Sequence, residues 1–115
     1  MLTVEKLKDY GANIEEALAR CFNNEAFYLR LVGMGLADQN FDRLRDAVAA
    51  GNATAAFEAA HALKGSIGNL SLTPIYAPVS ELTELLRGKA EMDPAAGPLL
   101  DEILLQLEAA RKLAD

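Results

Sequence analysis

The chain has 115 residues, of which 51% are hydrophobic and 24% are charged, and its formal net charge at pH 7 is −6. This length and balance predict one folded domain, spanning residues 1–115, with a single core. The acidic charge and the lack of any Lys/Arg run exclude a nucleic-acid backbone as a partner. No stretch approaches the roughly 18 apolar residues of a membrane span, and residues 1–9 lack a basic and apolar leader pattern, so we expect a cytoplasmic protein without a membrane segment.

The sequence of the N-terminal third of the chain predicts short helices. Asn13 and Glu16 have the spacing of a helix-capping pair, and Asn24 marks a second start. In the helix that follows, Phe27 and Leu31 are expected on the inner face. The only cysteine, Cys21, can form no internal disulfide and is expected to be buried as an apolar side chain.

A longer helix is predicted to begin around Asn40. Phe41, Leu44 and Val48 recur on one face, and Gly51 suits the left-handed stop after the last turn. The next helix is predicted to be capped by Asn52 and to continue to about residue 70.

Two further helices are predicted in the C-terminal half. Thr73 is expected to cap the first, with Pro74 in its opening turn, and apolar residues then repeat at helical spacing: Ile75, Val79, Leu82 and Leu86. Pro78 either shifts the start of this helix or kinks it, because proline removes a backbone donor. Gly88 provides a stop, and Asp93-Pro94 is predicted to begin the last helix.

No segment alternates as a strand does, and short connections favour antiparallel neighbours. The fold class is therefore predicted to be all-α: an antiparallel up-and-down four-helix bundle with one or two short N-terminal helices.

His61 is the only histidine, and the helical repeat directs it away from the apolar side of its helix. At about 100° per residue, Lys64, Gly65 and Gly68 fall within about 60° of His61. Each glycine costs a helix about 0.8–1.0 kcal/mol relative to alanine. Two explanations remain open for this cost: the glycines clear space for another protein to approach His61, or they let a neighbouring helix pack closely.

The run His61-Ala62-Leu63-Lys64-Gly65-Ser66 resembles the signature of the histidine-containing phosphotransfer (HPt) domains of two-component signalling. The similarity extends to residues 11–36 and 81–88. The resemblance implies a helical bundle in which His61 accepts a phosphoryl group from a receiver domain or a hybrid sensor histidine kinase and then passes it to another receiver. It implies a phosphocarrier that takes its phosphoryl group from a partner and has no turnover of its own.

Three other kinds of functional site can be checked against the same residues: a phosphate-binding loop, a serine nucleophile with a histidine base, and a metal site. The sequence Lys64-Gly65-Ser66 resembles the end of a phosphate-binding loop, but the glycine that this loop requires upstream of its lysine is absent, so we expect no ATP binding. Ser66 lies about 140° around the helix from His61, too far for a nucleophile and base pair. Glu58 and His61 have the Glu-x-x-His spacing of metal-binding bundles, but a single outward histidine cannot complete such a site, so neither a metal nor another cofactor is expected.

Phe57 and Glu58 complete the surface expected around His61. Phe57, about 40° away on the wheel, would offer an apolar anchor to a docking partner, and Glu58 would lie on the rim. The same face would also suit a non-catalytic helical adaptor, which differs from a phosphotransfer protein only in whether His61 reacts. We expect a monomer, because the core is self-contained.

Overall fold

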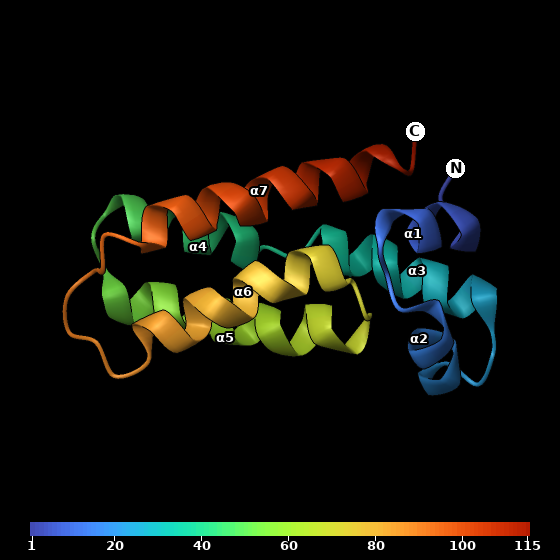
Figure 1. Ribbon diagram of the computed structural model, residues 1–115, viewed down its shortest axis with the longest axis horizontal. Helices are drawn as coiled ribbons and strands as arrows, with labels where there is room; N and C mark the ends of the chain where they lie inside the picture. Colours follow the sequence, from blue (N-terminus) through green and yellow to red (C-terminus); the bar gives the residue numbers. More distant parts are fainter.

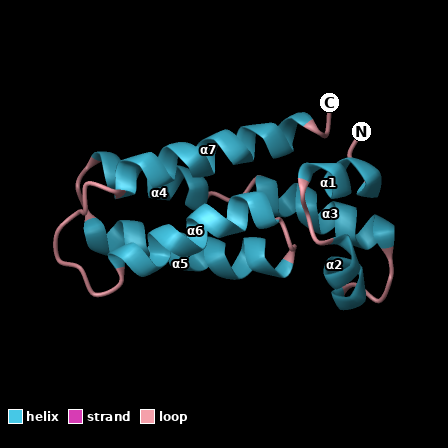
Figure 2. Ribbon diagram, in the orientation of Figure 1, coloured by secondary structure: helices cyan, strands magenta, loops and turns pink.

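The computed structural model describes residues 1–115, and every regular element in it is a helix (Figure 2). The predicted all-α class is therefore confirmed. The seven helices are α1 (Val4–Tyr10), α2 (Ile14–Arg20), α3 (Glu25–Leu36), α4 (Asn40–Ala49), α5 (Ala53–Asn69), α6 (Thr73–Leu86) and α7 (Ala96–Lys112).

Helices α4 to α7 form the larger part of the molecule (Figure 1). Helix α5 packs against α4 and α6, and α7 packs against α6 and α4, so the four helices surround a common interior. Helices α1, α2 and α3 gather at one end, where both chain termini also lie (Figure 1). None of the helices is both long enough and apolar enough to cross a membrane.

One continuous core joins the two parts of the molecule. Its fully buried large side chains come from almost every helix and include Leu7, Tyr28, Phe41, Leu44, Leu63, Ile67, Ile75, Leu82 and Ile103. Burying one such aliphatic side chain contributes about 1.5–3 kcal/mol. Cys21 belongs to the same core, as predicted.

Three asparagines begin helices as predicted. The Oδ1 atoms of Asn13, Asn24 and Asn52 accept hydrogen bonds from backbone N–H groups three residues later, at 3.2, 3.0 and 3.0 Å. Each bond satisfies one of the free donors of a first helical turn. Gly51 has a φ of +69°, the left-handed conformation expected after α4.

The predicted inner face of α3 is wrong by one residue. Tyr28, Val32 and Leu36 are buried, whereas Phe27 is 37% exposed and Leu31 is half-buried. The Tyr28 hydroxyl donates a buried hydrogen bond of 2.8 Å to the Leu70 carbonyl, which fixes this rotation of the helix.

The starts of the last two helices also differ from the prediction. Thr73 is the first residue of α6, after Leu72, and no side chain caps this end; Pro78 therefore lies inside the helix. Helix α7 begins at Ala96 because Asp93 first closes a turn. Its carboxylate accepts a hydrogen bond from the Ala95 N–H at 2.8 Å, and its carbonyl accepts one from the Ala96 N–H at 3.0 Å.

Candidate functional site

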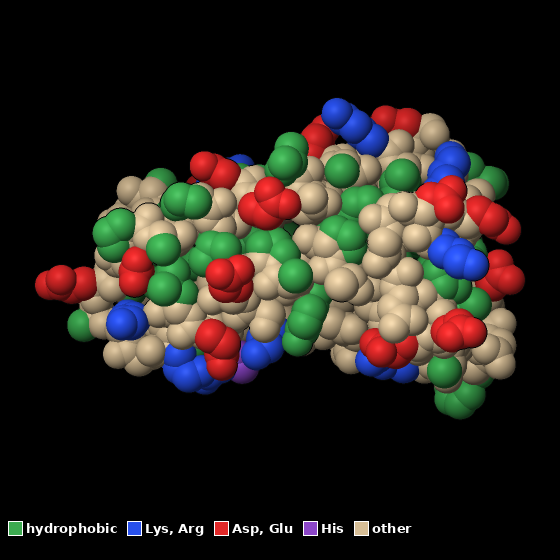
Figure 3. All heavy atoms as spheres, viewed as in Figure 1, with side chains coloured by type: hydrophobic (Ala, Val, Ile, Leu, Met, Phe, Trp, Pro, Cys, Tyr) green, Lys and Arg blue, Asp and Glu red, His purple; other side chains and the backbone are tan.

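Helix α5 presents His61 to solvent, as the helical repeat predicts. Ala59, Leu63 and Ile67 are buried on its inner side, whereas His61 is exposed. In the space-filling view His61, the only purple side chain, lies at the lower edge of the molecule beside blue side chains (Figure 3). Its ring is therefore open to a reacting partner.

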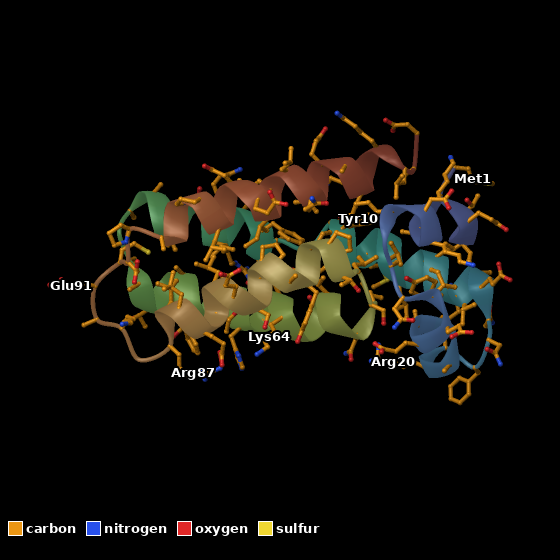
Figure 4. All side chains as sticks on the ribbon, in the orientation of Figure 1. Met1, Tyr10, Arg20, Lys64, Arg87 and Glu91 are labelled. Atoms are coloured by element: carbon orange, nitrogen blue, oxygen red, sulfur yellow. The ribbon has the colours of Figure 1, made fainter.

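An open groove of about 680 Å³ runs beside His61. Its lining comes from α2, from the outer face of α5, and from the start of α6 with the preceding turn: Asn13, Glu16, Arg20, His61, Lys64, Gly65, Gly68, Asn69, Ser71, Thr73 and Tyr76. Arg20 and Lys64, from two different helices, lie along the same lower edge (Figure 4). The predicted residues His61, Lys64, Gly65 and Gly68 thus share one surface.

The two glycines of this surface have different surroundings. A Cβ atom at Gly65 would meet nothing within 4 Å, so this position leaves the approach to His61 open. A Cβ at Gly68 would lie 3.0 Å from Cε1 and 3.2 Å from Cδ1 of Tyr76. Of the two explanations left open by the sequence, the structure favours close packing at Gly68, where the missing side chain admits the ring of Tyr76 on α6.

Phe57 lies directly against His61. The two ring centroids are 5.6 Å apart and the ring planes differ by only 10°, a stacked arrangement. On the same Phe57 ring, Cζ of Arg87 lies 5.2 Å from the centroid, within the range of a cation–π contact. Phe57 therefore joins the imidazole on α5 to a guanidinium from the end of α6.

Basic side chains lie beside the imidazole (Figure 3). The ammonium of Lys64 makes no hydrogen bond or ion pair, so it is free to meet an anion bound at His61. Hydrogen bonds from Arg87 lower the pKa of Glu84 below 4.5, against a desolvation effect that raises it. The positive charges of Arg87, Lys64 and protonated His61 also lower the pKa of Glu84, which shows that all of these groups share one electrostatic neighbourhood.

Glu58 does not join this site. It is exposed on the α4 side of α5, where it lines a second groove together with Arg43 and Asp46. The expectation that Glu58 forms part of the rim around His61 is corrected accordingly. Nowhere do three or more His, Cys, Asp or Glu side chains gather in a way that could hold a metal ion.

Ser66 has a structural role. Its hydroxyl lies 3.3 Å from Oδ2 of Asp38 and 3.4 Å from the Leu63 carbonyl oxygen, and donates toward both acceptors. These contacts tie the middle of α5 to the turn between α3 and α4.

The far wall of the groove is a charged cluster that sequence reasoning missed. The Nη1 atom of Arg20 donates hydrogen bonds to the carbonyls of Gly68 and Asn69 and, at 2.8 Å, to Oγ of Ser71. Oε1 of Glu16 accepts bonds from Arg20 at 2.8 Å and from Ser71 at 2.9 Å. These bonds fasten α2 to the last turn of α5; the only sequence signal for them is the four-residue spacing of Glu16 and Arg20.

The arrangement supplies an exposed nucleophile with nearby cations. The neutral form of an imidazole keeps a nitrogen lone pair that can attack phosphorus. A phosphoryl group placed there would carry a charge of about −1.5 to −2, which a cation one helical turn away would partly offset.

The family model described as "Hpt domain" matches residues 34–112. The match runs from the last turn of α3 to the end of α7 and includes His61, whereas α1 and α2 lie before it. It therefore covers the resemblance seen in residues 81–88 but only the last residues of the 11–36 segment. No curated protein and no solved structure matches the chain.

Proposed function

Because this chain belongs to the Hpt domain family, we propose that it is a phosphotransfer protein in which His61 carries a phosphoryl group between two-component signalling partners. The donor is a phosphorylated receiver domain or a hybrid sensor histidine kinase, and the acceptor is another receiver. The observation that carries the proposal is that the only histidine of the chain lies inside the matched region and is exposed, with open space at Gly65.

The transfer step needs no base from this chain. When the donor is an aspartyl phosphate, a ring nitrogen of His61 attacks phosphorus, the new nitrogen–phosphorus bond forms, and the phosphorus–oxygen bond to aspartate breaks with release of its carboxylate. The reverse reaction on a second receiver returns the imidazole. Lys64 offsets part of the phosphoryl charge. Two opposite unit charges 4 Å apart attract each other by about 1 kcal/mol in bulk water and by about 4 kcal/mol at an effective dielectric of 20.

The proposed form of the molecule is a cytoplasmic monomer in which residues 1–115 make one domain. Helices α4 to α7 are the antiparallel up-and-down bundle of this proposal. The contacts of α5 with α4 and α6, and of α7 with α6 and α4, support it, as does the single core that includes residues of α1 to α3.

Treatment with phosphoramidate, a small phosphodonor, tests this function. The intact mass of the wild-type protein should increase by one acid-labile phosphoryl group, and His61→Gln should show no increase. The free energy of unfolding of His61→Gln should stay within about 0.5 kcal/mol of the wild type, because the side chain is exposed. A known phosphotransfer domain, labelled in parallel, is the positive control.

The labelled protein should then lose its phosphoryl group to a purified receiver domain. If the wild type acquires no adduct while the positive control is labelled, the phosphotransfer function is wrong and the face around His61 serves a non-catalytic adaptor. An adduct that persists in His61→Gln would place the reactive group elsewhere.

A further inference from the structure

Arg87, the cation that lies over Phe57 in the Phe57–His61 stack, is hydrogen-bonded to a carboxylate. Arg87 lies over Phe57 at 5.2 Å, and the same ring stacks on His61 at 5.6 Å. Nε and Nη2 of Arg87 donate hydrogen bonds of 3.1 and 2.8 Å to Oε2 of Glu84, one turn earlier on α6. The guanidinium thus lies over the ring that stacks on His61, but it is bound to a carboxylate.

The bond between Arg87 and Glu84 is well placed to be exchanged. Both side chains are about half exposed, at 52% and 54%, and exposed ion pairs of this kind contribute little free energy. A single carboxylate oxygen accepts both hydrogen bonds, so the guanidinium does not make the two-oxygen contact that suits its geometry. A phosphoryl group offers three acceptor oxygens and nearly twice the charge of a carboxylate.

We propose that Arg87 is a phosphoryl-binding residue, and that hydrogen bonds to Glu84 hold its guanidinium in the unphosphorylated protein. This inference rests on the proposed function of His61. When His61 gains its phosphoryl group, the hydrogen bonds of Arg87 to Glu84 break and new ones form to the phosphoryl oxygens. Arg87 stays protonated throughout, so no proton moves. Phe57 keeps the guanidinium beside the imidazole in both states, and the Glu84 carboxylate is released to solvent.

The chain offers a matched control for this exchange. Arg45 on α4 is also 52% exposed and forms comparable surface ion pairs, with Asp42 and Asp46 at 3.2 Å each. It makes no contact with the residues around His61. Arg45→Ala therefore removes an arginine of the same exposure without touching the site.

The test is a pH titration of the phosphorus-31 NMR signal of the full chain, labelled on His61 with phosphoramidate. A bound guanidinium favours the dianionic phosphoryl group, so Arg87→Ala should raise the titration midpoint by roughly half a pH unit. Arg45→Ala should leave it unchanged, and Arg87→Lys should raise it by less. Lys64, Glu16 and Arg20 are present in every variant, so their charges contribute equally.

Glu84→Gln provides the test of the holding role. Replacing Glu84 frees Arg87 and should lower the midpoint, and Arg87→Ala should then have a larger effect in the Glu84→Gln background than in the wild type. Equal midpoints for wild type and Arg87→Ala would overturn the phosphoryl contact, and an equal effect of Arg87→Ala in both backgrounds would overturn the role of Glu84. Failure of the wild type to label at all would instead contradict the function of His61.

Discussion

The inner and outer faces of α5 belong to the same helix but differ in how far their side chains are buried. On the inner face Ala59, Leu63 and Ile67 are packed into the core with almost no exposed surface. On the outer face His61 and Gly65 are open to solvent. The difference indicates that stability depends on the inner face, whereas the proposed reaction uses the outer one, so that the outer face can be altered without unfolding the protein.

The largest expected effect lies on the inner face. Leu63→Ala removes a fully buried side chain and leaves a cavity, so it should lower the free energy of unfolding by about 2–5 kcal/mol. Urea denaturation followed by circular dichroism measures this loss. A loss as small as that of the outer-face variant His61→Gln would contradict the division between the two faces.

A smaller effect is expected at the C-terminal end of α5. Tyr28→Phe removes the hydroxyl that donates to the buried Leu70 carbonyl, and the lost bond should cost about 1–3 kcal/mol of unfolding free energy. Burial also raises the pKa of Tyr28 to about 12.

The raised pKa gives this variant an independent check. Tyr28 is ionised near pH 10 in the unfolded chain but only near 12 in the folded one, so the wild type should lose stability as the pH rises through this window. Tyr28→Phe should lose less over the same range. Burial and the charge of Glu102 raise the pKa of Tyr10 to about 12 as well, so the absorbance of tyrosinate in the native protein should be compared among wild type, Tyr28→Phe and Tyr10→Phe. Ionisation of Tyr28 at its ordinary pH would argue against a buried hydroxyl.

The outer face itself can be divided further by its two glycines. Gly65→Ala adds a methyl group in open space and should raise the free energy of unfolding by about 1 kcal/mol, through helix propensity. Gly68→Ala would place its Cβ 3.0 Å from the Tyr76 ring and should gain clearly less, or lose stability. Thermal denaturation of both variants measures these changes in stability. Equal gains in stability would show that the Tyr76 ring can move aside without cost.

The smallest effect is expected where α2 meets the end of α5. Hydrogen bonds from Ser71 and then from Arg20, together with the charge of Arg20, lower the pKa of Glu16. This contribution to stability is complete above the ordinary pKa of 4.5 and is lost as the pH falls through the lower value of the folded state. Denaturation midpoints measured from pH 6 to 3 should therefore fall less steeply in Glu16→Gln. A matched change at Glu15, which has no such partners, should leave the slope as in the wild type.

Local signals in the sequence located most helices because those signals act over a few residues. Asn13, Asn24 and Asn52 cap their helices through bonds to residues three positions away. The outward direction of His61 was also predictable. The apolar side of a helix faces the core, so a residue on the opposite side of the same helix is exposed to solvent. Helix α1 escaped prediction, although Thr3 caps it in the same way, through the backbone N–H of Lys6.

Contacts between distant residues account for what sequence reasoning missed. The rotation of α3 depends on the bond from Tyr28 to Leu70, which lie 42 positions apart in the chain. The contact of Arg87 with Phe57 likewise joins the end of α6 to the middle of α5, and neither helix alone shows it. No periodic pattern carries such pairings, since they depend on how two helices are placed against each other.

The close fit of Tyr76 over Gly68 has an evolutionary consequence. A Cβ at position 68 would lie 3.0 Å from the ring, which would have to shift to admit a side chain there, so the sizes of the two residues are coupled. Relatives that carry a larger residue at position 68 should carry a smaller one at position 76, and the two positions should vary together across the lineage of this protein.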